Sequence, residues 1–175
     1  MKKSVLGCWL LIIFSAWLTG CSLEPIEVET DPPAETISFS PQNLTVRTYS
    51  YFSLEVKINS VENIFGVGLD IKYDPVFFEW IRVSNENSFL SENSQVFLAA
   101  APFLPGELSF AITRLGKNSG SVSGPGLVAT LTFKSLNQRG QSRISFSKNH
   151  ICILEEDGSH YFKNIDQQAA LIKVR

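Results

Sequence analysis

The chain is built from short segments in which apolar and polar residues alternate, with Gly-, Pro- and Asn-rich breaks between them. In YFSLEVKIN, residues 51–59, every second side chain is apolar. A period of two is typical of a half-buried β-strand, and no segment shows a sustained helical period. Many short strands separated by turn signals predict an all-β sandwich. The predicted strands are residues 36–40, 43–47, 51–59, 65–75, 77–84, 94–100, 107–114, 127–134, 142–147, 150–154 and 170–174.

Residues 1–20 predict a secretory signal peptide. Two lysines precede an apolar run at residues 5–18, which ends in small residues. This run is shorter than the roughly 18 residues expected of a membrane-spanning helix. The sequence LTGC at residues 18–21 resembles the lipobox of bacterial lipoproteins, which implies cleavage before Cys21 and acylation of its thiol and amine. Acyl chains would anchor the protein stably in a membrane. The alternative is an ordinary signal peptide followed by an unrelated cysteine.

Residues 21–35 are rich in Glu and Pro, a composition that favours an extended linker, and residues 36–175 predict one domain. Without Lys2 and Lys3, the chain has 13 basic and 17 acidic residues, a net charge of −4, and no basic cluster. This balance argues against nucleic acid or anionic lipid as a partner. If Cys8 is removed and Cys21 is acylated, Cys152 has no disulfide partner, and we expect it to be a small buried apolar residue.

An ordered set of motifs resembles the cohesin domain of cellulosome scaffoldins. The motifs are FGVGLDIKYDP at 65–75, the apolar pair that follows it, and GLVATLTF at 126–133. The resemblance implies a nine-stranded jelly-roll β-sandwich, related to carbohydrate-binding modules, with no catalytic role and no cofactor of its own. One sheet face of such a domain binds a calcium-loaded dockerin carried by a secreted enzyme. The segment EEDGSH at 155–160 lacks the spaced ligands of a calcium loop.

The resemblance also implies that the outer face of the strand ending in YDP helps to form the dockerin-binding surface. Alternation places Gly66 and Gly68 on that face, where typical members carry hydrogen-bonding side chains, so we expect a flat surface. The alternative is that the glycines accommodate a twist or a bulge. The expected partner-binding face comprises Gly66, Gly68, Asp70, Lys72, Ser109, Ala111, Thr113, Arg143 and Ser145, and Ser147 would extend it.

The sequence offers little for catalysis. The segment GSVSG at 120–124 does not match the G-x-S-x-G nucleophile motif, because Val122 stands at its centre. His150 and His160 stand at a strand start and beside a turn, where histidines are commonly exposed. Paired carboxylates could cleave glycosidic bonds, but turn formation accounts for both candidate pairs, so we expect no enzyme. These pairs are Glu155 with Asp157, and Asp70 with Asp74.

Two other functions stay open. A carbohydrate-binding module would need exposed aromatic rings, and Tyr49 with Tyr51 offers one candidate stacking pair, whereas Trp80 alternates with Phe78 and is expected in the core. An envelope assembly or adhesion subunit is the third class. The sequence favours a lipid-anchored cohesin-type module that holds a dockerin-bearing polysaccharide-degrading enzyme at a bacterial outer membrane or cell surface.

Overall fold

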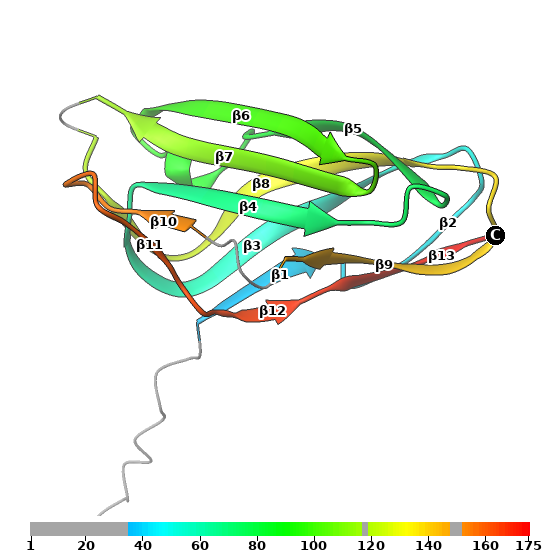
Figure 1. The fold of residues 1–175 in the computed structure, drawn as a ribbon. Helices are drawn as coiled ribbons and strands as arrows, with labels where there is room; N and C mark the ends of the chain where they lie inside the picture. The colour runs from blue at the N-terminus through cyan, green and yellow to red at the C-terminus, as the bar shows by residue number, and fades with distance from the viewer. Residues whose placement is uncertain (1–34, 117–118, 148–151) are drawn as a thin grey trace, which may run out of the picture.

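Two β-sheets packed face to face make up most of the computed structural model, which describes residues 35–116, 119–147 and 152–175 (Figure 1). One 3₁₀ turn, η1 (Phe89–Ser91), joins β5 to β6. The strands are β1 (Thr36–Ser40), β2 (Asn43–Val46), β3 (Tyr51–Ile64), β4 (Gly66–Lys72), β5 (Phe78–Ser84), β6 (Gln95–Leu104), β7 (Glu107–Leu115), β8 (Val122–Ser135), β9 (Gly140–Phe146), β10 (Cys152–Leu154), β11 (His160–Phe162), β12 (Asp166–Gln168) and β13 (Ala170–Val174).

The five-stranded sheet has the order β12-β1-β3-β8-β5, and the eight-stranded sheet contains the path β11-β10-β4-β9-β13-β2. In the larger sheet β7 also pairs with β4, and β6 pairs with β7. Along its whole length β4 pairs with β7, so β10 and β9 share its other edge. Strand β4 therefore lies in the middle of a broad surface that runs from β6 to β11.

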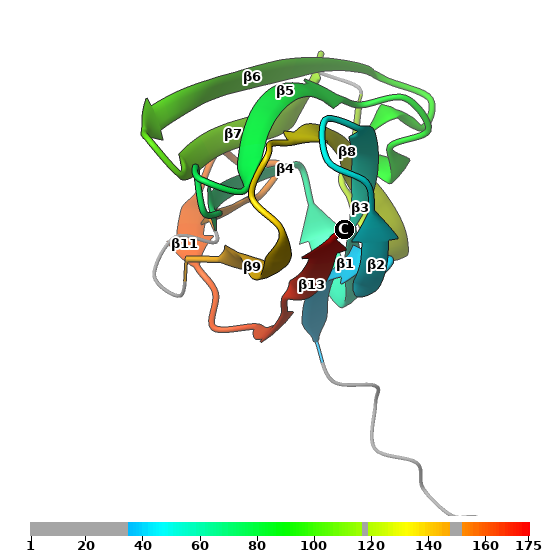
Figure 2. The ribbon, with the colours of Figure 1, turned by 90° about the vertical axis from the view of Figure 1, so that its right-hand side faces the viewer.

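The core lies between the sheets because every second residue of the long strands points inward. In β4 these are Val67, Leu69 and Ile71, all at most 2% exposed. The aromatic rings of Phe39 in β1 and Phe146 in β9 stack across the two sheets. Figure 2 views the sandwich from one end and shows β1 and β9 on opposite sides of this interior. All the strands of the described chain lie between Thr36 and Val174.

The structure confirms the predicted β-sandwich, but some strands differ from the prediction. Strand β3 continues to Ile64, past two register irregularities, and Ser60 and Asn63 there adopt φ values of 55° and 56°. These irregularities interrupt the alternation, which is why the pattern predicted an end at residue 59. The described chain has 13 strands, whereas the resemblance implied nine and the alternation predicted eleven. The alternation missed β11 and β12, which have three residues each and are too short to give a pattern.

The predicted signal peptide, Cys21 and His150 lie outside the described residues. Within residues 35–116, 119–147 and 152–175, no helix has the length and apolar character needed to cross a membrane. The first described strand, β1, begins at Thr36, where the linker was expected to end.

Candidate partner-binding face

Residues from five neighbouring strands form a row across the outer face of the larger sheet. In this central row Ala99 of β6 pairs with Ala111 of β7, Ala111 with Gly68 of β4, Gly68 with Cys152 of β10, and Cys152 with Phe162 of β11. Four of the five side chains are small, so the row forms a flat floor that ends at one aromatic ring. The face termed the platform consists of this row and its two neighbours, Phe97–Thr113–Gly66–Leu154–His160 and Ala101–Ser109–Asp70.

A shallow depression of about 440 Å³ lies over the central row. We term it the hollow. Small side chains from β6, β7 and β4 form its floor, and Asp70, Cys152 and Phe162 are among the residues at its margin. The structure therefore has a shallow concave surface, rather than the flat one expected from the sequence, on the face expected to bind a partner. The residues that define the hollow are Gly68, Asp70, Ala99, Ala111, Cys152 and Phe162.

The two glycines of β4 differ in their surroundings. Gly66 is buried, and a Cβ atom added there would lie 3.0 Å from the Ile112 carbonyl oxygen and from two atoms of Thr113. Neighbouring atoms thus already fill the space above Gly66, and the expected open surface is absent at this residue. Gly68 is only half-buried, and the nearest contact of an added Cβ would be the Cβ of Cys152 at 3.4 Å. Only the second glycine opens space for a partner.

Three polar residues of the expected face have side-chain partners on the same sheet. Ser109 Oγ donates a hydrogen bond of 2.5 Å to Asp70 Oδ1. Lys72 Nζ lies 3.5 Å from Glu107 Oε1, and both side chains are substantially exposed. Ser145 of β9 pairs with Lys72 in register, so it lies beside the platform. Arg143 is exposed and pairs with Leu171 of β13, one strand farther from the hollow.

Three phenylalanines of β6 and β11 are exposed, and Phe162 lines the hollow. Phe97, Phe103 and Phe162 are 57%, 75% and 66% exposed. The sequence prediction included the strand that carries Phe97 but did not assign it to the partner-binding face. In QVFLAAAPF, residues 95–103, the odd-numbered residues share one face of the strand, and this alternation could have identified Phe97. It shows which face points outward only once β6 is known to pair with β7. Clustered exposed aromatic side chains commonly mark protein-binding surfaces.

The prediction that Cys152 is a buried apolar residue is wrong. Its thiol is free, the residue is half-buried, and it pairs with Gly68 on the platform. The neighbouring Ile153 is fully buried instead. Because alternation in a three-residue strand fits either register, the sequence HICIL alone did not show which side chains point outward.

The candidate sugar-stacking residues lie away from the platform. Tyr49 and Tyr51 are 59% and 64% exposed, and Tyr51 belongs to β3 of the five-stranded sheet. Lys134 Nζ lies 5.8 Å from the centroid of the Tyr51 ring. Trp80 packs partly buried against the core, as expected, and its buried indole N–H has no hydrogen-bond partner among the described residues.

Two of the four carboxylates considered for catalysis, Asp74 and Asp157, act in turns, whereas Asp70 lies within β4. Asp74 Oδ1 accepts a hydrogen bond of 2.9 Å from the Val76 N–H. Asp157 Oδ1 accepts one of 2.7 Å from the Ser159 N–H, and hydrogen bonds from Ser159 lower the pKa of Asp157. Across the three described segments, no group of three or more His, Cys, Asp or Glu side chains could hold a metal ion.

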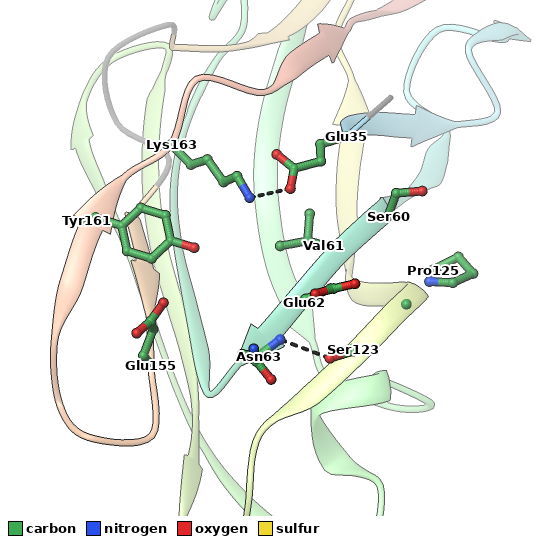
Figure 3. A pocket seen from close by; sticks show the side chains of 11 residues that line it. Glu35, Ser60, Val61, Glu62, Asn63, Ser123, Pro125, Glu155, Tyr161 and Lys163 are labelled. Atoms are coloured by element: carbon green, nitrogen blue, oxygen red, sulfur yellow. Dashed lines mark hydrogen bonds and ion pairs between the residues drawn. The ribbon is translucent and has the colours of Figure 1, made fainter. Parts of the chain in front are cut away.

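A larger and more polar depression, of about 890 Å³, lies at another part of the sandwich (Figure 3). Lys163 Nζ forms an ion pair with Glu35 there, and the Asn63 N–H donates a 2.9 Å hydrogen bond to Ser123 Oγ. Glu155 and Tyr161 lie across from the irregular end of β3. The described residues that line this depression include no histidine, so they do not form a catalytic triad in which a histidine activates a serine or cysteine.

Comparisons with known proteins bear on the fold of the whole domain. A comparison with curated protein sequences finds no match. Similar solved structures include a type II cohesin from Acetivibrio cellulolyticus, with 18% identity, a TM-score of 0.62 and coverage of 79% of this chain and 95% of the other. The OlpC cohesin of Clostridium thermocellum, solved bound to the dockerin Doc435, has 14% identity, a TM-score of 0.59 and coverage of 85% and 99%.

A non-cellulosomal cohesin from the archaeon Archaeoglobus fulgidus is similar at 18% identity, with a TM-score of 0.59 and coverage of 81% of this chain and 91% of the other. At these identities the structures show a shared fold. The family model for the cohesin domain matches residues 38–166, which is most of the chain and nearly all of the sandwich. The chain therefore belongs to the cohesin domain family.

Proposed function

We propose that this protein is a non-catalytic cohesin module that binds a dockerin through the platform. Several similar structures, including that of the OlpC cohesin, are complexes of a cohesin with a dockerin. The observation that carries the proposal is the central row, in which four small residues and Phe162 align across five strands. Such a surface lets a partner approach the sheet closely.

Binding would come mainly from buried apolar surface. Phe97, Phe103 and Phe162 are more than half exposed in the free domain, and burying a phenylalanine side chain contributes about 1.5–3 kcal/mol. Part of this favourable free energy offsets the translational, rotational and side-chain freedom that the two proteins lose on binding. The Lys72–Glu107 pair and Arg143 lie toward the margin, where charges affect the choice of partner and the rate of association more than affinity.

The location of the module is a second part of the proposal. Acylation of Cys21 would anchor the protein at the cell envelope, and the Glu- and Pro-rich residues 21–35 would hold the domain away from the membrane. The partner would then be a secreted enzyme that degrades polysaccharide. Metabolic labelling with an alkyne fatty acid tests the anchor: the label is expected in the intact protein and absent from Cys21→Ala. Equal labelling of the variant would refute the anchor.

Binding to dockerins is tested with residues 35–175 and each dockerin module encoded in the source organism's genome. Calorimetry should identify at least one that binds. Gly68→Arg should abolish this binding, because a long charged side chain would project over the central row, whereas the Cβ itself fits beside Cys152. Ser53→Arg, on an exposed position of β3 in the other sheet, is the matched control. Unchanged binding by folded Gly68→Arg would place the interface elsewhere.

Carbohydrate binding is the alternative function, and the exposure of Tyr49 and Tyr51 is the observation that favours it. Affinity electrophoresis in gels that contain soluble polysaccharide tests it directly. Retardation that is lost when both tyrosines are changed to alanine would support a stacking site on this side of the sandwich. Migration unaffected by the polysaccharides would eliminate it.

A further inference from the structure

We propose that the hollow over Gly68 is a socket for one bulky apolar side chain of the partner, with Phe162 as the wall at one end. This inference rests on the proposed dockerin-binding function and adds the chemistry of recognition. A leucine, methionine or phenylalanine on the dockerin surface would enter the socket, and hydrogen bonding would contribute little to specificity there.

The shape of the platform localises this socket. Along the central row no side chain extends beyond Cβ at Ala99, Ala111 and Gly68, whereas the adjacent row carries Phe97 and Leu154. The contrast with Gly66 shows that a glycine in β4 does not by itself leave space, because Thr113 fills the volume above that residue. The space at Gly68 results from small residues on three neighbouring strands together.

The lining of the hollow selects the chemistry of the occupant. Its floor is made by Ala99, Ala111 and Gly68, and an aromatic ring and a thiol stand at its margin. The carboxylate of Asp70 lies at the margin and already accepts a hydrogen bond from Ser109. A charged group placed over the floor would lose water without gaining a partner from these small side chains, which disfavours a polar occupant.

The size of the hollow fits a single large side chain and the backbone that carries it. An apolar cavity of about 150 Å³ holds a molecule of benzene, and this depression measures about 440 Å³ and is open to solvent. Phe162 is 66% exposed and follows Cys152 in the row, so a side chain seated over Gly68 would contact its ring. Buried aromatic contacts of this kind commonly dominate the affinity of an interface.

The test separates the shape of the socket from the apolar character of the face. Ala111→Leu keeps the surface apolar but fills the hollow, and it should weaken binding of the dockerin identified above at least tenfold. Ala111→Ser keeps the hollow open and should bind within about threefold of the unmodified domain. Ser53→Leu introduces the same side chain on the opposite sheet and serves as the control. Equal or tighter binding by Ala111→Leu would refute the socket.

A second measurement needs no substitution on the platform. Cys152 is the one cysteine of the sequence within residues 35–175, and it lies at the margin of the hollow. A saturating dockerin should therefore slow its alkylation by N-ethylmaleimide at least about tenfold, because the thiol must be accessible to react. If a dockerin binds but alkylation is not slowed, the socket is wrong while the proposed function stands. If none of the dockerins binds, the proposed function itself fails.

Discussion

The ring of Phe39 in β1 stacks on the ring of Phe146 in β9, with centroids 4.2 Å apart and planes inclined by 3°. This contact is part of the core between the five-stranded sheet and the eight-stranded sheet, since the two strands belong to different sheets. It lies next to the platform, because Phe146 pairs with Ile71 at the end of β4.

Phe146→Ala should destabilise the domain by about 3–5 kcal/mol, because it removes a large buried side chain and leaves a cavity against Phe39. Phe146 is 6% exposed, whereas Phe162 is 66% exposed, so Phe162→Ala is the matched control and should change stability little. Urea unfolding followed by fluorescence measures both. Similar losses of stability in the two variants would contradict this account of the core.

The two glycines of β4 should respond differently to alanine. Gly66→Ala forces a Cβ to within 3.0 Å of Ile112 and Thr113, and such overpacking costs about 1–3 kcal/mol. Gly68→Ala places its Cβ in ordinary contact with Cys152, so it should be neutral or stabilising by up to about 1 kcal/mol, since alanine restricts the unfolded chain. The difference in the free energy of unfolding checks this, and equal effects would show that crowding at Gly66 is relieved elsewhere.

Arg114 should not be replaceable by lysine. The residue is 4% exposed, and its guanidinium donates hydrogen bonds to the backbone carbonyls of Leu90, Glu92 and Ser119. A lysine ammonium cannot reach all three carbonyls, and each buried carbonyl left without a donor costs about 1–3 kcal/mol. Arg114→Lys should therefore lower the free energy of unfolding by about 3 kcal/mol, whereas Arg82→Lys, at an exposed position, should have little effect. Comparable stabilities of the two variants would argue against this role.

Tyr73 should make the domain sensitive to alkaline pH. Burial raises the pKa of its phenol above the ordinary value of 10.0, and the ring packs edge-on against Phe133. Because the pKa of Tyr73 is higher in the folded than in the unfolded state, the protonated phenol stabilises the folded domain. This contribution to the free energy of unfolding is complete below about pH 10 and is lost as pH rises through the higher folded pKa. The melting temperature of the unmodified domain should therefore fall more steeply above pH 10 than that of Tyr73→Phe. If the melting temperatures of the two proteins fall in parallel above pH 10, Tyr73 is not the source of the alkaline sensitivity.

The aromatic residues around the platform should control affinity, whereas those of the opposite sheet should not. Phe162→Ala and Phe97→Ala should each weaken dockerin binding by about tenfold, the scale of a substantial interface contact. Tyr51→Ala, on β3, removes an equally exposed ring and should leave dockerin binding unchanged. Calorimetry on the three variants measures these effects, and loss of binding in Tyr51→Ala alone would move the interface to the five-stranded sheet.

Much of this architecture could be predicted from local patterns. Alternation identified β4 and β7, and it placed Gly68 with Asp70 on one face of β4 and Ser109 with Ala111 on one face of β7, because successive side chains of a strand point to opposite sides. The fold class followed from the number of such segments. Both predictions depend only on residues close together in the sequence.

The rest of the face depends on pairings between distant segments. The position of Cys152 opposite Gly68, and of Phe162 beside Cys152, follows from the register of β10 with β4 and with β11. A shift of one residue would turn those side chains to the other face, and a short strand gives no pattern to exclude such a shift. The burial of Gly66 similarly depends on the side chain of Thr113, one strand away.

The placement of β1 has a mechanical consequence. Figures 1 and 2 show the described chain entering the sandwich at β1, on the side opposite β6. Strand β1 forms five residue pairs with antiparallel β3 and three with parallel β12. A pull on the chain at Glu35 along the axis of β1 would load these backbone hydrogen bonds together in shear, instead of opening them one after another. If the domain is anchored at its N-terminus and a bound partner pulls on the platform, β1 bears the force. The shear geometry of its pairing would then give the domain high resistance to mechanical unfolding from that end.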